Sequence, residues 1–181
     1  MVEEDRSVFG STLAQVCNDM FKECPGFNEL GAGEQETIAP PDADTIVASI
    51  GLAGADFRGA LVVHAPPAFF QRSYPPSLKR TVVSDAAMVD WAGEISNQLL
   101  GRLKNRLCQF GLDFAISTPT VVRGDKLILN ATATASVRYG LRVGDARADV
   151  VLNISQDAGK PLLPAKGPAQ VASLEGEALL F

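Results

Sequence analysis

A stripe of polar residues in the middle of the chain carries the groups that could do chemistry. Asp90, Glu94, Asn97 and Gly101 follow one another at steps of four, three and four residues, which places them on one side of a helix. Glu94 offers a carboxylate, and Asn97 offers an amide that both donates and accepts hydrogen bonds. Gly101 should cost a helix interior roughly 1 kcal/mol relative to alanine, so it indicates a place where another surface approaches closely.

Two alternatives without chemistry apply to this region. A glutamate and an asparagine on a solvated helix face commonly do no more than keep that face wet. Trp91, the only tryptophan, projects near the edge of the polar arc. Because exposed aromatic side chains beside polar residues are frequent at protein interfaces, this position favours contact with a partner. The alternative without such a contact is that Trp91 packs under the loop around Pro75.

The familiar catalytic and cofactor signatures are missing from the sequence. There is no GxGxxG, P-loop, HExxH or GxSxG motif, which excludes the commonest nucleotide, zinc-protease and hydrolase classes. His64 is the single histidine and ends an apolar run, so we predict a structural role for it. Cys17, Cys24 and Cys108 have no CxxC spacing, which indicates buried thiols in a reducing cytosol rather than a disulfide framework or a zinc site.

The composition is that of an acidic globular domain. The 181 residues include 16 Lys plus Arg and 21 Asp plus Glu, a formal charge of −5, which argues against nucleic acid as the main partner. With 46% hydrophobic residues there is enough apolar material for a core. No apolar run approaches the roughly 18 residues of a membrane span, and the acidic N-terminus lacks the order of a signal peptide. We therefore expect a cytoplasmic protein that binds neither nucleic acid nor membrane.

The polar stripe requires a long helix, which the sequence predicts over Asp85–Phe110. Ser84 or Asp85 is suited to the N-cap, and Gly111 to the position just after the helix. Apolar residues form the opposite arc: Met88, Val89, Ala92, Ile95, Leu99, Leu103, Leu107 and Phe110. The helix should therefore bury one side and leave the stripe on the other.

The remaining pattern predicts an α+β fold. An amphipathic helix is expected at Ser7–Cys24, a loop at Asn28–Asp44 and a short helix at Ala68–Ser73. The expected strands are Thr45–Leu52 and Phe57–His64, paired as a hairpin, then Leu127–Tyr139 and Ala146–Ile154, joined by a turn near Gly140–Asp145. This order predicts an antiparallel-rich sheet packed against the long central helix and the N-terminal helix.

The chain divides into a domain at residues 1–155 and a proline-rich C-terminal extension at residues 156–181. Pro161, Pro164 and Pro168 dominate the start of the extension. We expect it to be loosely held, with Leu174–Phe181 docking at its end.

Two linked segments of the sequence resemble the CheC/CheX/FliY group of chemotaxis phosphatases. The first, Asp90–Gly101, contains one ExxN pattern formed by Glu94 and Asn97. The second, Ile116–Gly124, enters a strand through a Ser-x-Pro sequence that begins at Ser117. Because the ExxN pattern occurs once, the resemblance is to the single-site CheX-like members of the group.

This resemblance covers roughly residues 7–155 and implies hydrolysis of the aspartyl-phosphate on a CheY-like response regulator. In that group, the residue matching Glu94 forms an ion pair with a lysine of the regulator, and the residue matching Asn97 orients the attacking water. Mg²⁺ is held by the regulator, so we expect no cofactor in this chain. The residues expected to contact the phosphorylated receiver domain are Asp90, Trp91, Gln98 and Gly101.

Two other functions stay open from the sequence. The first is a non-catalytic CheX-like adaptor that binds receiver domains or components of the flagellar switch. The second is a small-ligand or dimerisation module with an idle stripe, in which the strand Leu127–Tyr139 pairs with its copy in a homodimer.

Overall fold

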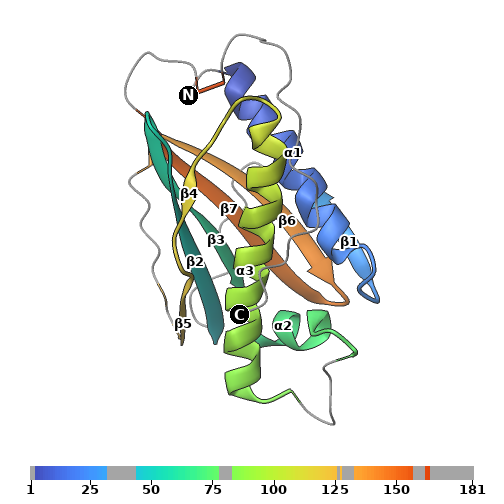
Figure 1. The fold of residues 1–181 in the computed structure, drawn as a ribbon. Coiled ribbons are helices and arrows are strands. Elements are labelled where there is room, and N and C mark those ends of the chain that lie inside the picture. The colour runs from blue at the N-terminus through green and yellow to red at the C-terminus, as the bar shows by residue number, and fades with distance from the viewer. Residues whose placement is uncertain are drawn as a thin grey trace.

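The computed structural model describes residues 3–31, 44–77, 83–125, 127, 133–156 and 162–163. Within these residues, seven strands form one sheet and three helices pack around it (Figure 1). No helix in this described part is long and apolar enough to cross a membrane. The arrangement confirms the predicted α+β fold with its antiparallel sheet, long helix and N-terminal helix.

All described strand pairs are antiparallel. The strands are β1 (Phe27–Gly31), β2 (Thr45–Ala53), β3 (Phe57–Ala65), β4 (Ala115–Ile116), β5 (Thr120–Gly124), β6 (Ala135–Val143) and β7 (Ala146–Gln156). Their order is β1-β6-β7-β3-β2-β4, and β5 also pairs with β2. The predicted hairpin is confirmed as β2 and β3, with Val47 opposite His64. Strands β4 and β5 therefore follow one edge of the sheet.

Two long helices cover one face of the sheet: α1 (Glu3–Phe21) and α3 (Asp85–Cys108). The short helix α2 (Pro67–Ser73) lies at one end of the sheet beside α3 (Figure 1). Arg106 of α3 donates to Gln15 Oε1 of α1 at 2.9 Å, and the Tyr139 hydroxyl of β6 donates to Asn18 Oδ1 of α1 at 2.7 Å. These contacts place α1 over β6, so α3 lies between α1 and the edge formed by β2 and β5.

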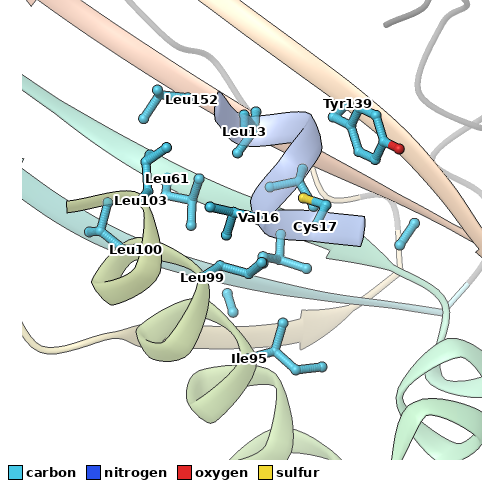
Figure 2. Packing of buried hydrophobic residues seen from close by; sticks show 14 of the residues in the cluster. Leu13, Val16, Cys17, Leu61, Ile95, Leu99, Leu100, Leu103, Tyr139 and Leu152 are labelled. Atoms are coloured by element: carbon cyan, nitrogen blue, oxygen red, sulfur yellow. The ribbon is translucent and has the colours of Figure 1, made fainter. Parts of the chain in front are cut away.

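The core fills the layer between the sheet and the two helices (Figure 2). Leu13 of α1, Leu99 of α3 and Leu61 of β3 are fully buried there. Burying one such side chain stabilises the fold by roughly 1.5–3 kcal/mol. The predicted apolar arc of α3 accounts for most of its buried residues, which are Met88, Ala92, Gly93, Ile95, Ser96, Leu99, Leu100, Leu103 and Leu107. This burial fixes the rotation of α3 and therefore the direction of its polar stripe.

Both ends of α3 carry the predicted caps. Ser84 Oγ accepts a hydrogen bond from the Ala87 backbone N–H at 3.2 Å, as an N-cap serine does. At the other end, Gly111 has a positive φ of 81°, and the Leu112 N–H donates to the Leu107 carbonyl at 3.2 Å. This is the Schellman arrangement, in which a left-handed glycine ends a helix.

The structure corrects the predicted loop at Asn28–Asp44 in its first part. Phe27–Gly31 forms β1, which pairs with β6 and places Phe27 opposite Val143. The strand has only five residues, and its two polar residues are adjacent, so its sequence carries no alternation that reveals it. Its pairing partner is more than a hundred residues away in the chain. Residues 32–43 lie outside the described part of the structure.

The bounds of two predicted elements also shift. The first helix spans Glu3–Phe21 rather than Ser7–Cys24. Strand β6 begins at Ala135 rather than Leu127 and continues to Val143, so the tight turn occupies only Gly144 and Asp145. Ala135–Tyr139 already pairs with β7 on one side, and residues 128–132 are not described, so a dimer through Leu127–Tyr139 stays a prediction.

The C-terminal extension docks at Leu162 and Leu163. The carboxylate of Asp5, in the first turn of α1, accepts hydrogen bonds from their backbone N–H groups at 2.9 and 3.2 Å. Asp5 is only 2% exposed, and both leucines pack against the core. The extension is therefore held close to its start. The predicted docking segment Leu174–Phe181 lies outside the described residues.

Candidate functional site

The polar stripe lies on the solvent side of α3. Asp90, Glu94 and Asn97 are exposed, while Ile95 and Leu99, on the opposite side of the same turns, are fully buried. The geometry therefore brings together the four predicted residues of the stripe, including the half-buried Gly101. Among the described residues, no group of three or more His, Cys, Asp or Glu side chains could hold a metal ion.

Glu94 and Asn97 differ in how they are held. Gln98 donates from Nε2 to Glu94 Oε1 at 2.6 Å, a contact between residues one turn apart. This bond orients the carboxylate and leaves its second oxygen available. The Asn97 side chain makes no hydrogen bond within the described part of the chain. Asn97 therefore presents an uncommitted amide beside an oriented carboxylate.

The chain beside the stripe is shaped by the Ser-x-Pro sequence. The Ser117 hydroxyl accepts a hydrogen bond from the Gly51 N–H at 2.8 Å, and the Ser117 N–H donates to the Gly51 carbonyl at 3.0 Å. A Cβ at Gly51 would lie 3.0 Å from Ser117 Oγ, so a larger residue there would crowd the hydroxyl that accepts this bond. Ser117 thus takes a position in the sheet between the short strand β4 and β5, where the chain turns.

The segment of Pro119 and Val121 packs against α3 at a second glycine, Gly93. A Cβ on Gly93 would lie 3.4 Å from Val121 and 3.7 Å from Pro119. Gly93 is buried and stands one residue before Glu94. Neither Gly51 nor Gly93 was predicted from the sequence to shape the site. A glycine inside a strand, such as Gly51, is a sequence signal that another part of the molecule approaches closely.

The N-terminal end of α3 is tied to β5 by a network of charges. The Arg123 guanidinium donates to Asp44 at 2.9 Å and forms an ion pair with Asp85 at 2.9 Å. The hydrogen bond from Arg123 holds the pKa of the Asp44 carboxyl below its usual value. The two aspartates belong to different segments of the chain, so the sequence carried no signal that would join them.

Trp91 is half-buried and packs within the chain. Its indole N–H donates to Ser73 Oγ at 3.1 Å, and its ring meets that of Tyr74 at 5.8 Å in an edge-to-face arrangement. This is the packing near Pro75 that the sequence analysis gave as the alternative. It joins α2 to α3 and fixes the turn that carries Asp90. A contact of Trp91 with a partner stays a prediction.

His64 lies away from the stripe. Side chains alternate along β3, and since Val63 and Ala65 are buried toward the helices, His64 points to the opposite face of the sheet. It stands opposite Asp149 on β7, and burial lowers its pKa. Asp149 is in turn paired with Arg138 at 2.9 Å. His64 is therefore separated by the sheet from the groups on α3.

Several solved structures share this fold. Chemotaxis protein CheX from Vibrio vulnificus aligns with a TM-score of 0.67 and 19% identity over 81% of this chain and 99% of that chain. A chemotactic CheC-like protein from Shewanella oneidensis gives a TM-score of 0.65 and 21% identity over 81% and 95%. CheX in a CheX–CheY–BeF₃–Mg²⁺ complex from Borrelia burgdorferi gives 0.58 and 17% over 82% and 96%. At these identities the likeness shows the fold.

The family is shown by the sequence itself. No functionally curated protein matches this chain significantly. The family described as chemotaxis phosphatase CheX, however, matches residues 46–141, more than half of the chain. This range begins in β2, contains the whole of α3 and the Ser-x-Pro turn, and ends in β6. The chain therefore belongs to the CheX family of chemotaxis phosphatases.

Proposed function

We propose that this protein hydrolyses the aspartyl-phosphate of a CheY-like receiver domain. The observation that carries the proposal is the pairing of an exposed, oriented Glu94 with an exposed and uncommitted Asn97 one turn further along α3. Membership of the CheX family supports the reaction class. A related CheX from Borrelia burgdorferi forms a complex with CheY, BeF₃ and Mg²⁺, which supports a receiver as the partner.

In the proposed reaction, Asn97 positions a water molecule. Its amide oxygen accepts a hydrogen bond from the water, while its NH₂ group can donate to the phosphoryl oxygens. The water attacks phosphorus in line with the bond to the aspartate oxygen, and that bond breaks. The products are inorganic phosphate and the free aspartate of the receiver. Such a reaction depends mainly on positioning and charge stabilisation, so an amide is sufficient.

Glu94 has a binding role in this proposal. Its second carboxylate oxygen is available for an ion pair with a lysine of the receiver, and a charge-assisted bond of this kind is stronger than a neutral one. A second carboxylate in place of Asn97 would instead repel the anionic phosphoryl group. Mg²⁺, which neutralises phosphoryl charge, would be supplied by the receiver.

The test is the lifetime of a phosphorylated receiver. Receivers encoded beside this protein would be phosphorylated with a small phosphodonor, and phosphate release would be followed with and without the protein. We expect acceleration by the wild type, none by Asn97→Ala, and a raised KM for Glu94→Ala. Asn105→Ala, the same change at an exposed position of the same helix, is the matched control. If the protein binds the phosphorylated receiver without accelerating phosphate release, this result would contradict the phosphatase function and indicate the non-catalytic adaptor.

A further inference from the structure

Among the described residues, nothing gives Gly101 a structural reason to be glycine. Glycine is usually required where φ is positive or where another backbone comes close. The described glycines with positive φ are Gly26, Gly111 and Gly144, and Gly101 lies inside the continuous helix α3. A Cβ built on Gly101 meets no described atom within 4 Å, apart from the backbone of its own helix. Alanine would fit there and would stabilise the helix.

The other two glycines within described helices behave differently. A Cβ on Gly10 of α1 would contact Val137 at 3.7 Å, and one on Gly93 would contact Val121 at 3.4 Å. A Cβ at either glycine would therefore make an ordinary van der Waals contact with the sheet. Gly101 differs, because no described atom beyond its own helix backbone lies within 4 Å of such a Cβ.

The long side chains that flank Gly101 are held away from it. Gln98, three residues before, turns toward the preceding turn of α3 and donates to Glu94 at 2.6 Å. Lys104, three residues after, would normally lean back over Gly101, because helical side chains point toward the N-terminus. Its ammonium group instead pairs with Asp113 at 3.4 Å and lies 5.9 Å from the centre of the Phe114 ring. The surface above Gly101 is therefore kept clear on both sides.

We infer that Gly101 is the point at which the receiver packs directly on the main chain of α3, next to Asn97. This inference rests on the proposed function, because the receiver is its occupant. Asparagine has a short side chain, so its amide reaches a water on the phosphoryl group only if the receiver comes close to the helix. A side chain at position 101 would hold the receiver away. A displacement of about 1 Å can reduce a rate about a hundredfold.

The test separates stability from function. Gly101→Ala and Gly101→Leu would be compared with Ala55→Leu, which adds a leucine at an exposed position outside α3, in the turn between β2 and β3. We expect Gly101→Ala to keep or raise Tm, yet to lower kcat/KM for the phosphorylated receiver several-fold. Gly101→Leu should lower kcat/KM at least tenfold and weaken binding to a receiver activated by beryllofluoride. Ala55→Leu should change neither kcat/KM nor binding.

The outcomes distinguish this inference from the proposed function. If the wild type accelerates dephosphorylation and Gly101→Leu does so equally, the inference about Gly101 is wrong while the proposed phosphatase function is supported. A fall in Tm for Gly101→Ala would also overturn it, since the position would then have a structural role. If the wild type binds the activated receiver without accelerating hydrolysis, the phosphatase is wrong. In that case, weaker binding of the activated receiver by Gly101→Leu would still support direct packing of the receiver on Gly101. Unchanged binding would overturn this inference.

Discussion

Two groups of polar residues on α3 differ in what they bind within the chain. At the N-terminal end of the helix, Asp85 and Asp44 share the guanidinium of Arg123. In the stripe, Asp90 and Asn97 make no hydrogen bond or ion pair within the described residues, and Glu94 is held only by its helical neighbour Gln98. The first group has its interactions satisfied inside the protein, whereas the second has them directed outward.

This difference separates polar residues that support the fold from those available to a partner. Arg123 joins β5 to α3 and to the start of β2, so its removal should change how the edge of the sheet is held. The exposed side chains of the stripe contribute little to the stability of the fold, because water satisfies their hydrogen-bonding groups. Changes in the stripe should therefore alter activity and leave stability almost unchanged, whereas changes in supporting groups should do the opposite.

The largest effect is expected for Asn97→Asp. The substitution keeps the size of the side chain and replaces a neutral amide by a carboxylate. The carboxylate would repel the anionic phosphoryl group, and it lacks the NH₂ group with which asparagine can donate a hydrogen bond. We expect the rate of receiver dephosphorylation to fall at least about a hundredfold, the loss typical for removing one positioned donor. Thermal unfolding should be unchanged. If Tm falls together with the rate, Asn97 contributes to the stability of the fold, and the comparison between the two groups of residues is wrong for it.

The next largest effect concerns stability through Asp5. Asp5→Ala removes the acceptor of two backbone N–H groups that hold Leu162 and Leu163. Leaving such groups unpaired costs about 1–3 kcal/mol each when they stay buried, and we expect the free energy of unfolding to fall by about 2 kcal/mol. Urea denaturation measures it. Glu4→Ala, the exposed neighbour, should have little effect. Equal results for both variants would contradict the role of the Asp5 contact.

A smaller effect is expected for Gln98→Ala. Loss of its bond to Glu94 should raise KM for the receiver a few-fold and leave kcat nearly unchanged. One pair of this kind contributes about 0.2–0.5 kcal/mol to a helix, and the proposed function gives the Glu94 carboxylate a role in binding. The decisive measurement is a double-mutant cycle with Glu94→Ala. In that background, Gln98→Ala should have no further effect. Additive effects would mean that Gln98 acts on the receiver independently of Glu94.

The smallest effect is a pH dependence of stability through Asp44. Because Arg123 lowers the pKa of Asp44 in the folded state, this pair stabilises the protein above the unfolded-state pKa of about 3.9. The contribution is lost as the pH falls through the lowered folded-state pKa. Arg123→Ala should therefore be less stable than the wild type at neutral pH, with the difference shrinking in acid. Denaturation at several pH values checks this, with the exposed Arg58→Ala as control.

Much of the fold could be predicted because it depends on local patterns. The apolar arc from Met88 to Leu107 specified α3, and Ser84 and Gly111 specified its ends. The alternation of β-branched residues specified the hairpin of β2 and β3. Strand β1 was missed because its evidence lies in β6, far along the chain. Pairing between distant segments leaves little trace in a strand of only five residues without alternation.

The sequence by itself determined which groups the stripe contains and that they share one side of a helix, because helical periodicity follows from residue spacing alone. Only the tertiary structure decided that this side faces solvent, that Glu94 is held by Gln98 while Asn97 is not, and that no described atom beyond its own helix backbone lies close above Gly101. The direction of the stripe depends on how α3 packs on strands that are remote in the chain, and a residue pattern does not specify that packing.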